Sequence, residues 1–162
     1  AELCAALDAA LADYNTMREQ EGKKLAEDIL GRAQSIETMT GQVEEQSPKT
    51  VADYHARLAA KMQEVLESKQ LDESRILTEA AIFADKVAVD EETVRLRSHL
   101  AQLRTMLEQG GPVGRKLDFL IQEFNRETNT IGSKCNDLAV TKLVVDMKAE
   151  IEKIREQIQN LE

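Results

Sequence analysis

Apolar residues recur with the spacing of helix faces along almost the whole of this 162-residue chain. They make up 42% of the sequence, whereas aromatic residues make up 3%, and the chain contains only seven Gly and two Pro. Residues that favour helices, such as Ala, Leu, Glu, Lys, Arg and Gln, dominate the composition. This pattern is typical of long helices rather than of sheets, and we expect an all-α fold.

Residues 1–70 are expected to form a long antiparallel helical hairpin. A helical stripe of apolar residues begins at Leu3 and continues to Val43. Ser47-Pro48 then has the form of a helix cap followed by Pro at the first helical position, which predicts that a second helix starts there. The apolar faces of both helices are narrow, so the hairpin would need a partner surface.

Residues 71–162 are expected to form a C-terminal helical domain, a bundle of shorter helices. Asp90 offers an N-terminal cap for one of them, and Gly110 followed by Pro112 marks the clearest break in the chain. Asp137 offers a cap for the last helix. The fold class predicted is therefore a long helical hairpin followed by a helical bundle.

The last helix has the most regular apolar pattern, which alternates steps of four and three residues over about three heptads. The a positions are Val144, Ile151 and Ile158, and the d positions are Val140, Met147, Ile154 and Leu161. A seam of this kind favours pairing with other helices. The partners could lie inside a bundle of this chain or in another subunit.

Charge is unevenly distributed along the chain. The net charge of −9 by itself argues against nucleic-acid binding, but residues 93–136 contain seven Lys and Arg against four acids. Cys4 and Cys135 lie far apart without metal-ligand spacing, so we expect reduced thiols. No apolar run is long enough for a membrane span, and the first residues lack a signal-peptide pattern.

The stretch "GRKLDFLIQEFNRETNTIGSKCN", residues 114–136, combines a helical apolar stripe with weak helix formers. Its core face on a helical wheel contains Leu117, Leu120, Ile121, Phe124, Thr128, Ile131 and Cys135. Its polar stripe contains Asp118, Gln122, Asn125, Asn129 and Ser133, with Arg126 at its edge. The Asn, Thr, Ile and Gly residues of this helix cost about 3–4 kcal/mol relative to Ala. The amides could bind a partner helix or a polynucleotide backbone, or could be buried and satisfied by neighbouring helices.

Three ionisable residues are candidates for chemistry. Glu123 and Glu127 are four residues apart, so their charges repel each other unless a lysine or a bound metal lies between them. His99 lies beside the apolar face of its own predicted helix, near three arginines. It could be structural, or it could act as a general acid or base or as a phosphate contact.

Four segments resemble the C-terminal region of the YicC/YloC family of bacterial endoribonucleases: EAAIFADK, VRLRSHLAQLR, GGPVGRKLDFLIQEFNRETNTIGSK and KAEIEKIREQIQNLE. MREQEGKKLAEDI resembles the middle region of the same family, so the resemblance covers essentially the whole chain in order. Cys135 stands where the family commonly has Ser, and Arg97 where it commonly has Lys. Members of the family carry an upstream mixed α/β domain, and we expect this chain to be the helical remainder of such a protein.

The resemblance implies a cytoplasmic homo-oligomer, hexameric at full length, that cleaves RNA internally with a divalent metal, Mg²⁺ or Mn²⁺. No membrane and no small-molecule cofactor is expected. The residues that we expect to bind RNA are Arg97, Arg115, Lys116, Asn125, Arg126, Asn129 and Lys134. The expected metal ligands are Asp118, Glu123 and Glu127, and the expected catalytic residues are His99, Glu123 and Glu127. The competing hypothesis is a non-catalytic helical scaffold for oligomerisation or RNA binding.

Overall fold

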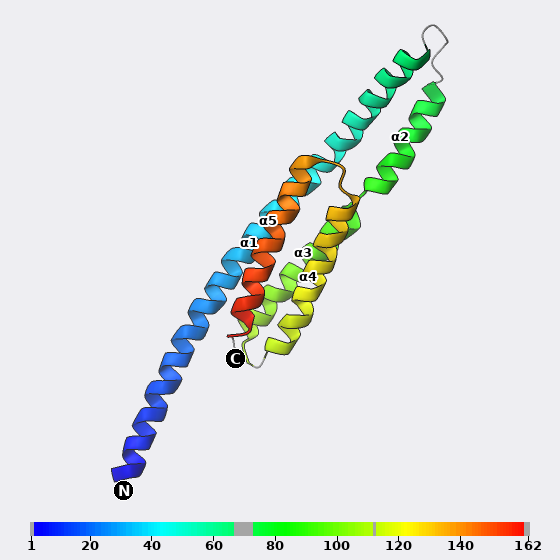
Figure 1. Ribbon diagram of the computed structural model, residues 1–162. Helices are drawn as coiled ribbons and strands as arrows, with labels where there is room; N and C mark the ends of the chain where they lie inside the picture. The colour runs from blue at the N-terminus through cyan, green and yellow to red at the C-terminus, as the bar shows by residue number, and fades with distance from the viewer. Residues whose placement is uncertain (1, 67–72, 112, 161–162) are drawn as a thin grey trace.

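The computed structural model describes residues 2–66, 73–111 and 113–160. Within these ranges every regular element is an α-helix, which confirms the all-α prediction. The helices are α1 (Glu2–Leu66), α2 (Glu73–Val87), α3 (Asp90–Gln109), α4 (Gly114–Lys134) and α5 (Leu138–Ile158). They make an elongated molecule in which α1 extends along almost the full length (Figure 1).

The centre of the molecule is a four-helix bundle. The middle of α1 packs against α5 and α3, and α4 packs against both of these, so the four helices form a closed ring around one core. Each helix contributes fully buried side chains to this core, among them Ile36, Leu100, Phe124 and Met147. The predicted bundle is therefore confirmed. The division of the chain into domains at residue 70 stays a prediction, although α1 belongs to the same core as α3, α4 and α5.

The regular pattern of α5 is an internal seam. All three a positions and the d positions Val140, Met147 and Ile154 are buried against helices of this chain, chiefly α1 and α4. Leu161 lies outside the described residues. Of the two possible partners for this seam, the structure shows the one within the chain.

The turn expected at Ser47-Pro48 is wrong, because α1 continues through it as one helix of 65 residues. The buried stripe of α1 keeps its steps of four and three across the proline, through Thr40, Val43 and Thr50. Pro48 faces solvent. A proline inside a helix removes one hydrogen bond and costs about 3 kcal/mol, but a turn here would remove the second half of the stripe from its partners. Continuous burial therefore outweighs the local signal.

A helical hairpin does exist, but its partners are the C-terminal part of α1 and α2. These two helices pack side by side, and the rings of Tyr54 and Phe83 stack at a centroid distance of 3.8 Å. The segment between them, residues 67–72, lies outside the described residues. The antiparallel hairpin predicted within residues 1–70 is therefore wrong, because the second helix of the hairpin is α2.

Helix ends follow the local signals in two of three places. Gly110 ends α3 with φ of 65°, a conformation that favours glycine, as expected. Asp137 caps α5 by accepting hydrogen bonds from the backbone N–H groups of Ala139 and Val140 at 2.7 and 3.0 Å, also as expected. Asp90, expected as a cap, is instead the first residue of α3, after Val89, which makes no side-chain cap.

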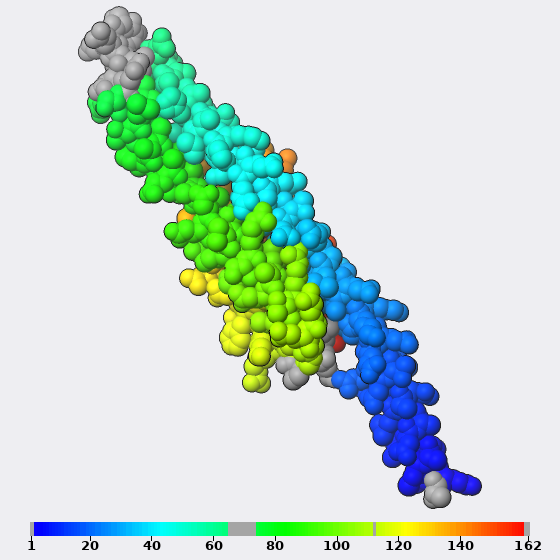
Figure 2. All heavy atoms as spheres, turned by 180° about the vertical axis from the view of Figure 1, so that it is seen from behind, coloured from blue at the N-terminus to red at the C-terminus, as the bar shows by residue number. Residues whose placement is uncertain are grey.

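The N-terminal part of α1 extends beyond the bundle. Figure 2 shows this segment projecting away from the other helices. Its side chains are exposed from Glu2 to Glu21, including Leu3, Leu7 and Leu11. Within the described ranges, no helix combines the length and the apolar character that crossing a membrane requires.

The continuity of α1 makes a specific prediction for Pro48. Pro48→Ala should raise the free energy of unfolding by about 2–3 kcal/mol, because it restores a helical hydrogen bond at an exposed position. Urea unfolding followed by circular dichroism measures the change. Lys49→Ala, at the next exposed position, is the control and should stay within about 0.5 kcal/mol of the wild type. A destabilised Pro48→Ala variant would indicate a turn at this position.

Candidate functional site

Helix α4 carries the core face that the helical wheel predicts. Leu117, Leu120, Ile121, Phe124, Thr128 and Ile131 are buried, and Cys135 is half-buried. Two of the weak helix formers serve packing. A Cβ at Gly132 would lie 3.0 Å from Cγ1 of Val144, so glycine lets α4 and α5 approach closely, and Thr128 is enclosed in the core.

The amides of α4 are not buried among neighbouring helices. Asn129 is exposed, and half-buried Asn125 donates a hydrogen bond to the carbonyl of Ile121 on its own helix at 3.2 Å. The alternative in which neighbouring helices bury and satisfy these amides is therefore wrong. Their polar groups remain on the outer surface of α4.

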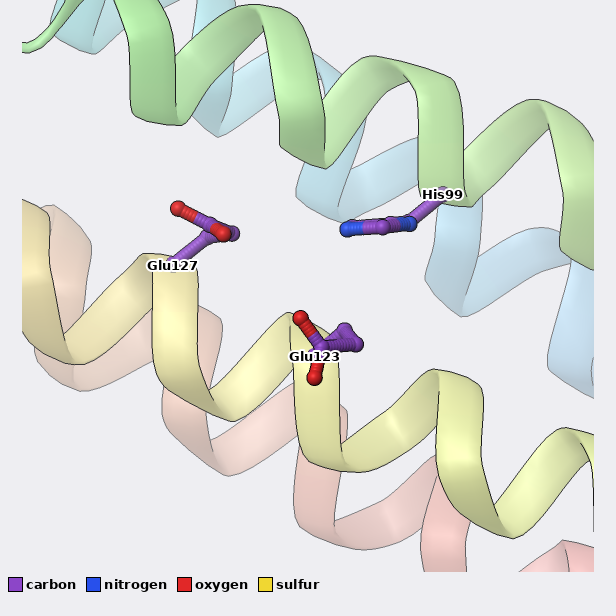
Figure 3. Close-up of side chains that lie close together, drawn as sticks. All are labelled: His99, Glu123 and Glu127. Atoms are coloured by element: carbon purple, nitrogen blue, oxygen red, sulfur yellow. The ribbon is translucent and has the colours of Figure 1, made fainter.

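His99 of α3 and Glu123 and Glu127 of α4 point toward one another across the packed pair of helices (Figure 3). One ligand atom from each lies within 4.8 Å of the other two. Glu127 is only 2% exposed, whereas Glu123 and His99 are half-buried. Four-residue spacing places both glutamates on one face of α4, and the antiparallel packing of α3 brings the imidazole opposite them.

Both ring nitrogens of His99 are buried, and neither has a hydrogen-bond partner among the described residues. Buried polar atoms are nearly always paired with protein or water, because an unpaired one loses its hydration without compensation. The ring lies at the edge of the apolar core, with its centroid 6.4 Å from that of Phe124. The unpaired imidazole beside the two carboxylates therefore fits a set of metal ligands.

A network of ion pairs holds Glu127 in place. Nε of Arg95 lies 2.9 Å from Oε1 of Glu127, and the other guanidinium nitrogens pair with Glu91 and buried Glu92. Lys134 completes the network, because its ammonium donates to both carboxylate oxygens of Glu92 at 3.0 and 3.1 Å. The network fixes the α3–α4 register at the candidate site.

The pKa values reflect this pairing. Burial alone would raise the pKa of Glu92, but its hydrogen bond to Lys134, a backbone hydrogen bond and the charges of Lys134 and Arg95 together lower it. The side-chain hydrogen bond to Glu127 is the main reason that the pKa of Arg95 is raised. Glu92 is thus a carboxylate at neutral pH despite its burial.

Sequence reasoning missed Arg95 and Glu92 as members of the site. The signal was present, since Arg95 is one turn and Glu92 two turns before His99 on the same helix. The spacing alone does not identify Arg95 and Glu92 as site residues, because their role depends on Glu127 and Lys134 of α4, which lie opposite them.

Asp118 does not join the other expected metal ligands. It is exposed, and the described cluster of possible ligands contains His99, Glu123 and Glu127 without it. Five residues separate Asp118 from Glu123, which on a helix is a rotation of about 140°. The structure thus brings together two of the three expected ligands and adds the histidine.

Two of the expected RNA-binding cations have intramolecular partners. Arg97 makes a two-pronged contact with Glu44 of α1 at 2.8 and 3.1 Å, and Lys134 binds Glu92. Hydrogen bonding to Arg97 is the main cause that lowers the pKa of Glu44. Arg115, Lys116 and Arg126 are exposed on α4, where Arg126 makes only a surface pair with Glu123 at 3.3 Å.

Comparison with known proteins identifies the family. The family model described as "Endoribonuclease YicC-like, C-terminal" matches residues 43–162. The chain belongs to this family. The YicC-like model thus includes the C-terminal part of α1, from Val43 on, together with α2 to α5, and with them all residues of the candidate site.

Two relatives carry the name "Probable endoribonuclease YicC". The protein from Clostridioides difficile (strain 630) is 48% identical over 158 residues, which are 97% of this chain and 54% of the relative. The protein from Haemophilus influenzae (strain ATCC 51907 / DSM 11121 / KW20 / Rd) is 40% identical over 161 residues, 99% of this chain and 55% of the relative. The chain spans about half the length of these YicC relatives.

The pairing of Lys134 with Glu92 predicts a structural role that can be measured. Lys134→Met should lower the free energy of unfolding at pH 7 by about 1–3 kcal/mol, because Glu92 loses one of its two cations. Since the pKa of Glu92 is lowered in the fold, its stabilising contribution is present above the unfolded pKa of about 4.3 and is lost as pH falls through the folded value. The difference between variant and wild type should therefore shrink at pH 3.5.

Urea unfolding at the two pH values provides the measurement. Lys116→Met is the matched control, because Lys116 is exposed, and it should change stability by less than about 0.5 kcal/mol. Equal effects of the two substitutions would contradict the structural role of Lys134.

Proposed function

We propose that this chain is the catalytic helical part of an endoribonuclease, with His99, Glu123 and Glu127 as ligands of a divalent metal. The observation that carries the proposal is the buried imidazole without a hydrogen-bond partner, within 4.8 Å of two carboxylates. The names of the two relatives support cleavage of RNA. RNA is then the substrate of the site.

The donor set fits Mn²⁺ better than Mg²⁺. Mg²⁺ strongly prefers oxygen ligands and keeps several waters, whereas transition metals accept imidazole nitrogen together with carboxylates. The one-nitrogen, two-carboxylate set of His99, Glu123 and Glu127 therefore favours Mn²⁺. When bound, such an ion supplies positive charge at the scissile phosphate and lowers the pKa of a water.

The protein's own residues have three tasks in this proposal. Glu123 and Glu127 would hold the ion, and the 2.9 Å ion pair with Arg95 fixes the position of the Glu127 carboxylate. Arg115, Lys116 and Arg126 are exposed cations on the outside of the same helix, suited to bind phosphates of the RNA backbone. Exposed Asn129 and half-buried Asn125 add amide groups on the same helix.

The burial of His99 favours a ligand over a general base. As a base, His99 would take the proton of a ribose 2′-hydroxyl, and the 2′-oxygen would attack phosphorus. The bond from phosphorus to the 5′-oxygen of the next nucleotide would break, which leaves a 2′,3′-cyclic phosphate and a 5′-hydroxyl. Both ring nitrogens are covered in this structure, so a 2′-hydroxyl has no direct access to them. If His99 is a metal ligand, the substrate contacts the ion and does not need to reach the ring nitrogens themselves.

Assembly and location are further parts of the proposal. We infer that the protein acts as a homo-oligomer, a hexamer, in the cytoplasm, as the resemblance to the YicC/YloC family implies. The exposed leucines at the start of α1 are consistent with a contact surface in such an assembly.

Metal binding by the 162-residue chain tests the centre directly. Titration with Mn²⁺, followed by the electron paramagnetic resonance signal of the free ion, should show one site. Glu123→Gln, Glu127→Gln and His99→Gln should each weaken it by at least about tenfold, since each removes a ligand. Glu108→Gln, an exposed glutamate of α3 outside the cluster, should bind Mn²⁺ as the wild type does. Equal Mn²⁺ binding by all four variants would contradict the proposed centre.

Cleavage assays test the reaction. An internally labelled RNA should be cut by the full-length C. difficile relative and by this chain in Mn²⁺, and EDTA should stop the reaction. The products should lack 2′,3′-cyclic phosphates. Cyclic ends formed in EDTA would exclude the metal route and leave His99 as the candidate base, which His99→Gln would then test. Unchanged cleavage by the Glu123→Gln/Glu127→Gln variant, together with a broken oligomer, would support the scaffold hypothesis for this helical part.

A further inference from the structure

An exposed aromatic ring lies on α4 beside the candidate centre. Phe119 is 64% exposed, whereas the other two phenylalanines are engaged: Phe124 is in the core and Phe83 stacks on Tyr54. Among the described residues, the ring of Phe119 has no aromatic or cation–π partner. A large apolar ring in water is a group with unused contact surface.

The position of Phe119 relates it to the centre. Phe119, Glu123 and Glu127 follow one another at four-residue intervals, so each lies about 6 Å further along α4 and about 40° around it. Burial rises along this line from Phe119 to Glu123 to Glu127. The ring therefore lies one turn from Glu123, on its solvent side.

The ring is set within a polar and basic stripe. Arg115, Phe119, Gln122 and Arg126 follow one another at steps of four, three and four, and all four are exposed. Arg126 pairs only with Glu123 at the surface, where such pairs are weak, and Arg115 has no ion pair among the described residues. Two exposed guanidinium groups thus lie on either side of the ring along the outer face of α4.

Resting on the proposed function, we infer that Phe119 stacks on a base of single-stranded RNA and leads the strand to the centre at His99, Glu123 and Glu127. Proteins bind single strands with aromatic rings for bases and cations for phosphates, which is the combination on this stripe. The bases of a duplex are already stacked in pairs and present no free face to a ring. The substrate class is therefore unpaired RNA, and Phe119 is a positioning residue, not a catalytic one.

The absence of Trp from the chain makes the test direct. Phe119→Trp introduces a sole tryptophan whose fluorescence should be quenched, with saturation, by a single-stranded oligoribonucleotide. A duplex of the same sequence should give little quenching. Leu77→Trp places a tryptophan at an equally exposed apolar position on α2 and should report no quenching by either RNA.

Binding by side-chain variants separates stacking from bulk. Phe119→Leu and Phe119→Ala should weaken binding of the single strand about 5- to 150-fold, the range of one base–aromatic stack, whereas Phe119→Tyr should bind as the wild type does. The salt dependence should be unchanged in Phe119→Leu and smaller in Arg115→Gln or Arg126→Gln, which remove charge. In cleavage assays the loss in Phe119→Leu should fall on KM for single strands more than on kcat.

Three results would overturn the proposal. The first is that Phe119→Leu binds the single strand with wild-type affinity. The second is that RNA quenches Phe119→Trp and Leu77→Trp equally. The third is that Phe119→Ala changes the oligomer mass but not RNA binding, which would make the ring a subunit contact. Failure of the wild-type chain to bind single-stranded RNA overturns it as well. Binding that depends on Phe119 without any cleavage would instead refute the proposed endoribonuclease activity and leave base stacking in place.

Discussion

The packing of α3 against α4 depends on two carboxylates that are buried in an otherwise apolar bundle. Glu92 and Glu127 are each almost fully covered, and a buried charge is tolerated only when it is paired. Arg95 and Lys134 supply the pairing, and their ion pairs join one helix to the other at fixed positions along both. The register that satisfies these charges also brings His99 opposite Glu123 and Glu127. Stability and the geometry of the candidate site therefore have a common cause, since the same side chains that make the helix pair possible orient the Glu127 carboxylate.

Much of the fold could be predicted because the signals are local and periodic. The core face of α4, the seam of α5 and the Asp137 cap each depend on residues within one helix, and the structure agrees with all three. Ser47-Pro48 shows where such reasoning fails. Its local signal indicates a helix start, but the stripe through Val43 and Thr50 is buried by other helices, and only their contribution decides between a turn and a continuous helix. The local pattern does not show contacts between distant residues. For that reason the hairpin was expected within residues 1–70, whereas the C-terminal part of α1 pairs with α2.

The same distinction explains the candidate site. Glu123 and Glu127 could be recognised as a pair because they are one turn apart, and His99 could be singled out on its own helix. Sequence does not give the offset between α3 and α4, and for that reason Arg95 and Glu92 were missed. The inclusion of Asp118 has a different cause, because its rotation of about 140° from Glu123 follows from the spacing within α4 alone. Gly132 stood out in the sequence only as a weak helix former, and its reason lies on another helix, because a Cβ at this position would lie 3.0 Å from Cγ1 of Val144.

The basic character of residues 93–136 also changes meaning once the partners are known. Of the seven Lys and Arg in this region, Arg97 and Arg104 are neutralised by Glu37 and Glu44 of α1, and Arg95 and Lys134 by carboxylates between α3 and α4. Their charges are used inside the fold and are a poor basis for binding a polyanion. The cations that remain on the surface are Arg115, Lys116 and Arg126, all of them on α4. Fewer cations of this region are therefore available to a ligand than the count of seven suggests. Those that are available lie on the helix that also carries Glu123, Glu127 and the exposed ring of Phe119. The net charge of −9 is therefore compatible with binding of an RNA strand at α4, where these three exposed cations lie.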